Sequence, residues 1–213
     1  SEMCIRDSLC IEPLMASAEF SFKKYQVENG LSHNTTWCAI QDSYGFLWIG
    51  TSNGLNCYYG SGNKIYRNVL NDKYSLGNNF VSSLMEEGED LWIGTSSGLY
   101  IYDRSDDHFL YFDKTTKYGV FISCEVKKIV KTKNGLIWIA TLGQGIFIYD
   151  PAKDVLTQNS IRTFFAWDIC QGTDSLVYVS SMQEGLLCFD EEGTFLQNYP
   201  VSVSYTHLTL PTI

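Results

Sequence analysis

The sequence predicts an all-β fold made from one repeated unit of four short strands, and three observations support this prediction. First, a short motif centred on an aromatic residue recurs four times, at intervals of about 40 to 46 residues. Second, each copy contains four short apolar runs separated by turn-forming residues. Third, aromatic residues make up 15% of the 213 residues, a high share that suits stacked sheets. A repeat of this length and content is typical of the blades of a β-propeller.

The repeated motif is clearest in its first two copies. Leu-Trp-Ile-Gly-Thr occupies residues 47–51 and again 91–95, and Gly-Leu follows each after two residues. Residues 137–141 give a third copy and residues 177–181 a weaker fourth, each with one extra residue before the glycine. The aromatic anchors are Trp48, Trp92, Trp138 and Tyr178, and the small residues two positions later are Gly50, Gly94, Ala140 and Ser180. We expect the tryptophan anchors to lie in the core, and the small residues to leave room for the neighbouring sheet.

The four strands of each unit can be placed in order. The first strand carries an apolar pair three positions apart: Trp37 and Ile40, Val81 and Leu84, Val126 and Ile129, Ala166 and Ile169. The second is the anchor motif, whose nearly continuous apolar character predicts cover on both faces. A hairpin turn then ends in Gly54, Gly98, Gly145 or Gly185, where we expect a positive φ. The third strand follows directly, and the fourth begins at Ile65, Phe109, Val155 and Phe195.

An aspartate column closes the third strand in three of the copies. Its members are Asp103, Asp150 and Asp190. A carboxylate at this place accepts hydrogen bonds from backbone N–H groups of the following turn, so we expect a structural role. A calcium site is the alternative, but it would require a dense acidic loop that the sequence lacks.

The organisation of the chain follows from these repeats. We expect blades over about residues 34–74, 78–118, 123–160 and 164–200. Residues 20–27 are interpreted as a lone outer strand of the kind that completes the last blade of a propeller and protects its edge. Four blades could close as a small ring, but we favour a fragment of a larger ring of about seven blades. Residues 1–18 are interpreted as a leader remnant or non-native segment, and residues 201–213 as a non-native tail.

Charge and hydropathy narrow the cellular context. The formal net charge is -9 and the pI is about 4.7, which disfavours binding to nucleic acid or to an anionic membrane. No apolar stretch reaches the roughly 18 residues that a spanning helix requires. Ala16 and Ala18 form a small-x-small pattern that resembles the cleavage end of a secretory signal peptide, or they are a chance Ala-Ser-Ala. We favour export.

Catalytic and metal-binding patterns are weak in this sequence. The seven cysteines include no Cys-x-x-Cys pair, and Cys57 and Cys188 fall at equivalent strand positions, where they read as small apolar fillers. The histidines His33, His108 and His207 do not recur in register with the repeat. We therefore expect no catalytic residue, no metal site and no cofactor. Lys127 and Lys128 are interpreted as a solvated or channel-lining pair rather than an anion site.

A candidate ligand site lies on one face of the predicted propeller. Trp37 and Trp167 fall in or near first strands, which line the central channel. The polar residues expected on the same face are Asn34, Asn79, Glu125, Gln144, Gln183 and Glu184. Aromatic rings beside amides and carboxylates suit a sugar, whose C–H face stacks while its hydroxyls form hydrogen bonds. The alternative is that Trp37, aligned here with Val81 and Val126, is simply packed in the core.

Residues 30–34, 40–51 and 54–56 resemble the two-component regulator propeller repeat, and the resemblance covers about residues 20–199. It is specific in the first two copies and degenerate in the fourth, and residues 57–59 depart from the usual Arg-Tyr-Asp ending. The resemblance implies the periplasmic sensor region of a Bacteroidetes hybrid two-component system histidine kinase. In that family many members sense oligosaccharides and signal to a histidine kinase elsewhere in the same chain.

The resemblance also implies the partners of these blades. They are an oligosaccharide ligand, the remaining blades and signalling domains of the parent chain, and a second copy in a homodimer. No bound nucleic acid and no membrane span are expected in this fragment. An alternative is an interaction or dimerisation propeller without a ligand site. A propeller lyase is a third possibility, but it would require clustered acid-base residues on one face, and the sequence shows none.

Overall fold

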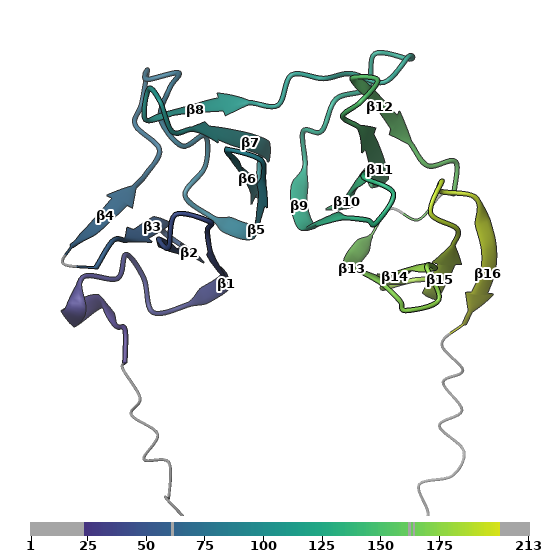
Figure 1. Ribbon diagram of the computed structural model, residues 1–213, viewed down its shortest axis with the longest axis horizontal. Coiled ribbons are helices and arrows are strands. Elements are labelled where there is room, and N and C mark those ends of the chain that lie inside the picture. Colours follow the sequence, from purple (N-terminus) through teal and green to yellow (C-terminus); the bar gives the residue numbers. More distant parts are fainter. Residues whose placement is uncertain (1–23, 61, 162, 164, 201–213) are drawn as a thin grey trace, which may run out of the picture.

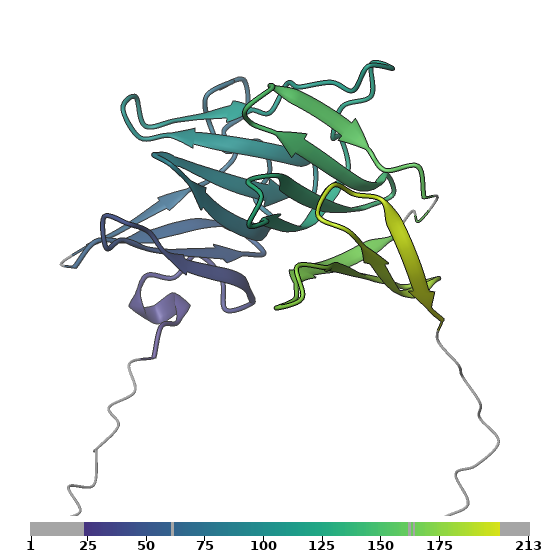
Figure 2. The same ribbon diagram turned by 45° about the vertical axis from the view of Figure 1, so that its right-hand side comes forward.

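The computed structural model describes residues 24–60, 62–161, 163 and 165–200, which form four four-stranded antiparallel sheets and one short 3-10 helix, Val27–Asn29. In each sheet the strands are hydrogen-bonded in sequence order. The sheets follow one another along an arc, with the first strand of each on the inner side and the fourth on the outer side (Figure 1). Figure 2 shows the same arrangement from the side, with twisted strands in every sheet. The prediction of an all-β propeller with four blades is confirmed.

The strand bounds of the four blades are as follows. Blade 1 contains β1 (Thr36–Gln41), β2 (Leu47–Thr51), β3 (Gly54–Tyr58) and β4 (Asn63–Tyr66). Blade 2 contains β5 (Val81–Glu87), β6 (Asp90–Thr95), β7 (Gly98–Asp103) and β8 (His108–Tyr111). Blade 3 contains β9 (Glu125–Lys131), β10 (Ile137–Leu142), β11 (Gly145–Asp150) and β12 (Val155–Gln158). Blade 4 contains β13 (Ala166–Gln171), β14 (Val177–Ser181), β15 (Gly185–Phe189) and β16 (Phe195–Tyr199).

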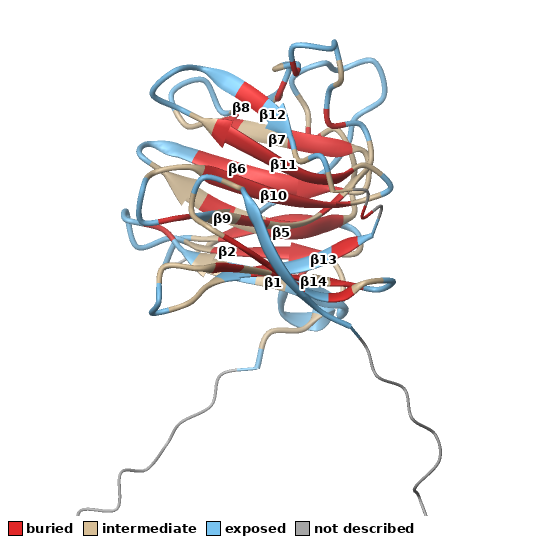
Figure 3. Cartoon of the chain, turned by 90° about the vertical axis from the view of Figure 1, so that its right-hand side faces the viewer, coloured by how far each residue is buried: buried red, intermediate tan, exposed pale blue. Residues whose placement is uncertain are grey.

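The core lies between neighbouring blades and not within any one of them. Separate apolar clusters join blades 1 and 2, blades 2 and 3, and blades 3 and 4. The anchors Trp48, Trp92 and Trp138 are all buried in these clusters, as predicted. Figure 3 shows burial concentrated in the middle strands of the blades, whereas the outer strand β16 is exposed along its length. Each fully buried side chain of this size contributes about 2 to 3 kcal/mol, so the stacking of blades is the main source of stability.

The column of small residues in the second strands makes this stacking possible. A Cβ atom added to Gly50 would lie 2.6 Å from Cγ1 of Val81 in the next blade. One added to Gly94 would lie 2.8 Å from Cγ1 of Val126, again in the next blade. Neither position can accept a side chain unless the neighbouring first strand moves. The predicted role of these glycines is thereby confirmed.

The turn residues also behave as predicted. The four hairpin glycines all have positive φ, for example 123° at Gly54 and 121° at Gly98. A Cβ atom at Gly54 would also come within 2.8 Å of the carbonyl oxygen of Tyr66, so both conformation and space demand glycine. The aspartates of the third-strand column accept hydrogen bonds from the backbone N–H groups of their own turns: Asp103 from Ser105, Asp150 from Ala152 and Lys153, and Asp190 from Glu192 and Thr194.

The register of the first strand differs from the prediction by one residue in blade 1. Thr36 pairs with Thr51 and Cys38 with Gly50, so Trp37 between them is a bulge residue outside the ladder. The other first strands skip one residue at the same place: Ser82 in β5, Lys127 in β9 and Trp167 in β13. Trp37 therefore belongs in a column with these three residues, and its alignment with Val81 and Val126 was wrong. Blade 1 has Thr36 and Ala39 at the positions of Val81 and Leu84, so the more apolar pair one residue later was aligned in their place.

Two further expectations concern the edges of the repeat region. The fourth strand of blade 1 begins at Asn63, two residues before the expected Ile65, because Tyr58 already pairs with Asn63, whereas the equivalent Tyr102 in blade 2 pairs with Phe109. Of the predicted outer strand at residues 20–27, residues 20–23 lie outside the described part of the chain. Residues 24–26 form no strand, and Val27 begins the 3-10 helix, which Gly30 ends with a φ of 97°.

The expectations for residues 1–18 and 201–213, including the signal-peptide pattern and His207, also lie outside the described residues. Within the described part of the chain, no helix has the length and apolar character needed to cross a membrane.

Candidate ligand-binding site at the channel

Three of the four blades contribute a bulge residue to one cluster on the inner side of the arc. The ammonium nitrogen of Lys127, from blade 3, lies over the ring of Trp167 at 4.3 Å and over the ring of Trp37 at 5.5 Å. Blade 2 adds Phe80, which directly precedes β5 and whose ring centre is 5.2 Å from that of Trp37. We call Trp37, Phe80, Glu125, Lys127 and Trp167 the channel cluster.

Lys127 is the centre of this cluster and is held firmly. Its side chain is only 10% exposed, and its Nζ atom donates a hydrogen bond of 2.8 Å to Oε1 of Glu125. Attraction between an ammonium group and an aromatic face is worth about 0.5 to 2 kcal/mol, and more when water is excluded. The lysine therefore fixes both indole rings in place and brings blades 1, 3 and 4 together on the channel side.

The two tryptophans remain available for contact with a ligand. Trp37 is 48% exposed and Trp167 is 45% exposed, which is unusual for so large an apolar side chain. Nε1 of Trp37 donates a hydrogen bond of 2.9 Å to Oγ of Ser52, which orients the ring. Trp37 is therefore not packed in the core, the alternative considered from the sequence. The residues first aligned with it, Val81 and Val126, are fully buried, whereas Trp37 is not.

The cluster is chemically complementary to a polar ligand that has apolar faces. Two rigid aromatic surfaces provide stacking at low entropic cost, Lys127 provides a donor and Glu125 an acceptor. A positive and a negative group in direct contact leave the cluster close to neutral. The arrangement suits a hydroxylated ring such as a sugar more closely than a strongly charged ligand.

Three other predicted site residues lie in the surrounding loops. Oδ1 of Asn34 accepts a hydrogen bond of 3.0 Å from the backbone N–H of Val27. Oδ1 of Asn79 accepts one of 2.7 Å from the backbone N–H of Asn68. Gln183 is exposed in the turn that precedes β15. The side-chain oxygens of the two asparagines thus brace loop backbone.

Gln144 and Glu184 are also committed to loop structure. The Gln144 amide accepts a hydrogen bond from the backbone N–H of Ser123 and donates one to the carbonyl oxygen of Phe121, both at 2.9 Å. Oε2 of Glu184 accepts a hydrogen bond of 2.7 Å from Oγ of Ser181. Of the eight predicted residues, the structure therefore brings Trp37, Trp167 and Glu125 together. That they bind a ligand stays a prediction.

Lys127 is the central residue of the cluster, whereas its sequence position predicted only a solvated or channel-lining pair with Lys128. The error in register hid it, because Trp37 was aligned with the buried column instead of with the bulge column. A usable signal existed in blade 4. Ala166 aligns with Val81 and Val126, and Trp167 comes directly after it. Shifting Trp37 by one position would have placed both tryptophans in the column of Lys127.

Potential metal ligands do not converge in the described residues. Among them, no group of three or more histidine, cysteine, aspartate or glutamate side chains could hold a metal ion. Nδ1 of His33 accepts a hydrogen bond from the backbone N–H of Thr35, and the ring of His108 stacks on Tyr74 at 4.4 Å. These two histidines therefore have local structural roles.

Four antiparallel blades around a common channel define a β-propeller segment. The family described as two component regulator propeller matches residues 30–53 and 75–97, which lie across blades 1 and 2. These two segments are therefore similar to the two-component regulator propeller repeat. It is 38% identical over 68 residues to histidine kinase P4 of Formosa agariphila, a match that covers 32% of this chain and 5% of that protein.

Solved structures show the same fold. The extracellular domain of a hybrid two component system from B. thetaiotaomicron superposes with a TM-score of 0.72 at 21% identity. The extracellular domain of a one component system from the same organism superposes with a TM-score of 0.64 at 18% identity. These matches cover 83% and 80% of this chain, but 26% and 25% of those chains. Virginiamycin B lyase from Staphylococcus aureus gives a TM-score of 0.58 at 13% identity, covering 80% of this chain and 57% of the lyase. The chain thus spans about a quarter of the length of these extracellular domains.

Proposed function

We propose that these blades belong to the periplasmic sensor region of a hybrid two-component regulator, where they bind an oligosaccharide. Binding would be passed to a histidine kinase elsewhere in the parent chain, and the fragment itself would be non-catalytic. The remaining blades and signalling domains of that chain, in a homodimer, are the proposed partners. The family match in blades 1 and 2 and the similarity to a histidine kinase support the sensor role.

The channel cluster carries the proposal that the ligand is a saccharide. Trp37 and Trp167 are the two exposed indoles of the described chain, and both are fixed by one lysine. An aromatic face desolvates the C–H surface of a pyranose, while Lys127, Glu125 and Ser52 supply donors and acceptors for its hydroxyls. A ligand that contacts blades 1, 3 and 4 together would favour one arrangement of the blades over another, which is what a signalling switch requires.

Calorimetric titration of the purified chain with a panel of defined oligosaccharides tests this proposal. We expect saturable binding to one glycan class, and a loss of about tenfold or more in affinity for Trp37→Ala and for Trp167→Ala. Tyr59→Ala is the matched control, because Tyr59 is 45% exposed like Trp167 but lies at the opposite end of the strands, after β3. Equal losses in all three variants, or no binding by a folded chain across the panel, would reject a saccharide site in the channel cluster.

A further inference from the structure

The interface between blades 1 and 2 is closed by a partly buried arginine. Arg104, in the turn after β7, donates hydrogen bonds to Oδ2 of Asp42 at 2.7 Å and to Oε1 of Glu86 at 3.3 Å. The Asp42 carboxylate is fully buried, and it also accepts a hydrogen bond of 2.7 Å from Nε1 of Trp48. Acid, arginine and indole therefore satisfy one another at this interface.

The equivalent position between blades 2 and 3 lacks the arginine. The strand pairings place Glu87 where blade 1 has Asp42, and Pro151 where blade 2 has Arg104. Lys131 takes the position of Glu86 and draws Glu87 into an ion pair of 2.6 Å. The turn after β11 thus supplies no cation to the space that Arg104 fills one blade earlier.

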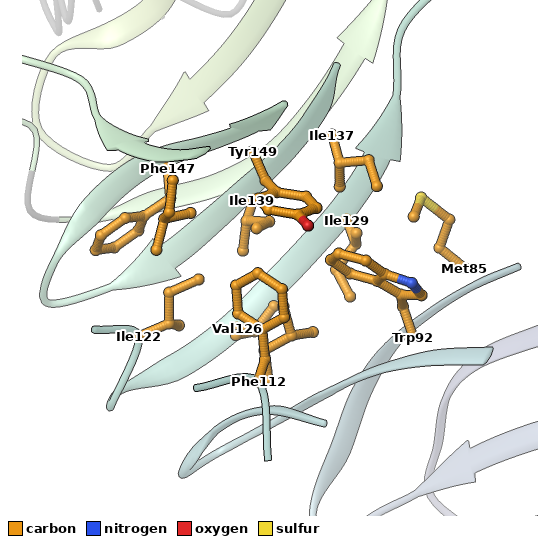
Figure 4. Packing of buried hydrophobic residues seen from close by; sticks show 12 residues of the cluster. Met85, Trp92, Phe112, Ile122, Val126, Ile129, Ile137, Ile139, Phe147 and Tyr149 are labelled. Carbon is orange, nitrogen blue, oxygen red and sulfur yellow. The ribbon is translucent and has the colours of Figure 1, made fainter. Parts of the chain in front are cut away.

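A pocket of about 640 Å³ lies at this place. Its apolar floor comes from Trp92, Ile101, Phe112 and Tyr149, and Figure 4 shows three of these four side chains packed together. Trp92 is only 4% exposed, and its Nε1 atom has no hydrogen-bond partner among the described residues. In Figure 4 that nitrogen lies at the margin of the packed side chains and not within them. Nε1 of Trp138 also lacks a partner among the described residues. Trp92 differs from Trp138 because it lines this pocket.

Four acidic side chains also line the pocket. They are Glu87, Asp90, Asp103 and Asp113. The lysine at the rim, Lys114, is already paired with Asp154 at 2.6 Å. Burial and the neighbouring charges, Asp103 first among them, raise the pKa of Asp90, which shows that its charge is poorly compensated. The pocket thus combines an excess of negative charge, an apolar floor and one buried donor.

We infer that the pocket between blades 2 and 3 binds a hydroxylated organic amine, of the class of the amino sugars. Its ammonium group pairs with Asp90 and Asp103, as the guanidinium of Arg104 pairs with acids at the preceding interface. One of its oxygens accepts the hydrogen bond of Trp92 Nε1, and its C–H surface rests on the apolar floor. The pocket opens at the opposite end of the strands from the channel cluster, and this inference does not depend on the proposed function.

Glucosamine is the probe, and the indole N–H resonances of the ¹⁵N-labelled chain are the readout. The chain has five tryptophans, so each signal can be assigned with a Trp→Phe variant. We expect the Trp92 signal to shift saturably with glucosamine and to stay in place with glucose, which lacks the positive charge. A Trp92 signal that ignores glucosamine, or that responds equally to glucose, would overturn the inference.

A variant that fills the pocket provides the second arm. Pro151→Arg introduces the residue that blade 2 carries at the equivalent position, and we expect it to weaken glucosamine binding by about tenfold or more. Pro151→Ala is the matched control and should bind like the parent chain. Unchanged Trp37, Trp48, Trp138 and Trp167 signals would show that both variants are folded. Binding that survives in Pro151→Arg would contradict the inference, whereas failure of oligosaccharides to bind at Trp37 and Trp167 would not affect it.

Discussion

Trp37 and Trp167 occupy the same bulge position in β1 and β13, the first strands of the first and last described blades. Lys127, the bulge residue of β9, lies over both indole rings, at 5.5 Å and 4.3 Å. One lysine thereby connects blades that are not neighbours in sequence. The same contact fixes two aromatic surfaces that the chain leaves nearly half exposed, so the residue that links the blades also holds the proposed ligand-binding surface.

Replacing Lys127 by methionine tests the structural part of this account. Methionine keeps much of the length of the side chain but loses the charge, so both indole contacts weaken and Glu125 loses its partner. We expect the free energy of unfolding to fall by about 1 to 2 kcal/mol, measured by urea denaturation with tryptophan fluorescence. Lys128→Met is the control, because the Lys128 side chain is exposed and its ion pair with the exposed carboxylate of Asp168 is long, at 3.8 Å. Equal effects of the two variants would argue against a central role for Lys127.

The buried acid of blade 1 gives a larger expected effect. Asp42→Ala removes the acceptor for Trp48 Nε1 and one of the two acidic partners of Arg104. Breaking a buried pair leaves desolvated groups without partners, so we expect a loss of about 3 kcal/mol in thermal or urea unfolding. Lys153→Ala, which removes an exposed pair with Asp150, should leave stability nearly unchanged. A small effect of Asp42→Ala would show that water readily replaces the carboxylate.

The same carboxyl predicts a pH dependence. Burial acts to raise the pKa of Asp42, but hydrogen bonds from Trp48 and Arg104 and the charge of Arg104 outweigh it and lower that pKa below 3.8. A lowered folded-state pKa contributes stability above the ordinary pKa, and this contribution is lost as the pH falls through the folded value. The stability advantage of the parent chain over Asp42→Asn should therefore be constant near neutral pH and shrink below about pH 4. Unfolding free energies measured from pH 7 to pH 3 decide this, and an advantage that grew on acidification would contradict the assignment.

The glycine column predicts a steric effect between blades. An added methyl group at Gly50 would lie 2.5 Å from Sγ of Cys38 and 2.6 Å from Val81, so blade 2 would have to move. We expect Gly50→Ala to destabilise the chain by about 1 to 3 kcal/mol, measured as a lower urea midpoint. Ser180→Ala changes the same column in blade 4, where a Cβ atom is already present, and should be nearly neutral. If Gly50→Ala proved neutral as well, close packing of blade 1 on blade 2 would be refuted.

Much of the fold could be predicted because each repeated residue has one local physical reason. Trp48 and Trp92 mark buried second strands, Gly54 marks a turn with positive φ, and Asp103 marks a turn that needs an acceptor. The same residue types recur at the same spacing in successive blades, so their structural roles can be predicted from the sequence. The number of blades in the complete ring stays a prediction, since spacing within a blade does not determine how many blades follow.

The candidate site was only partly predictable. Trp37 and Trp167 stood out as aromatic residues outside the anchor column, but their common partner Lys127 depends on a one-residue bulge that changes the side of the strand on which a residue points. Asn34 and Gln144 were chosen for polarity and predicted position. Their side chains satisfy backbone groups in loops, and the loop conformations that require this are not encoded in the repeat.

The most direct test of the central claim uses the five tryptophans as reporters of where an oligosaccharide binds. In a titration of the ¹⁵N-labelled chain with the glycan that binds by calorimetry, the indole N–H signals of Trp37 and Trp167 should shift together and saturate at one dissociation constant. The signals of the buried Trp48, Trp92 and Trp138 should stay in place. Shifts confined to the buried tryptophans, or binding without a response from Trp37 and Trp167, would contradict a ligand site in the channel cluster.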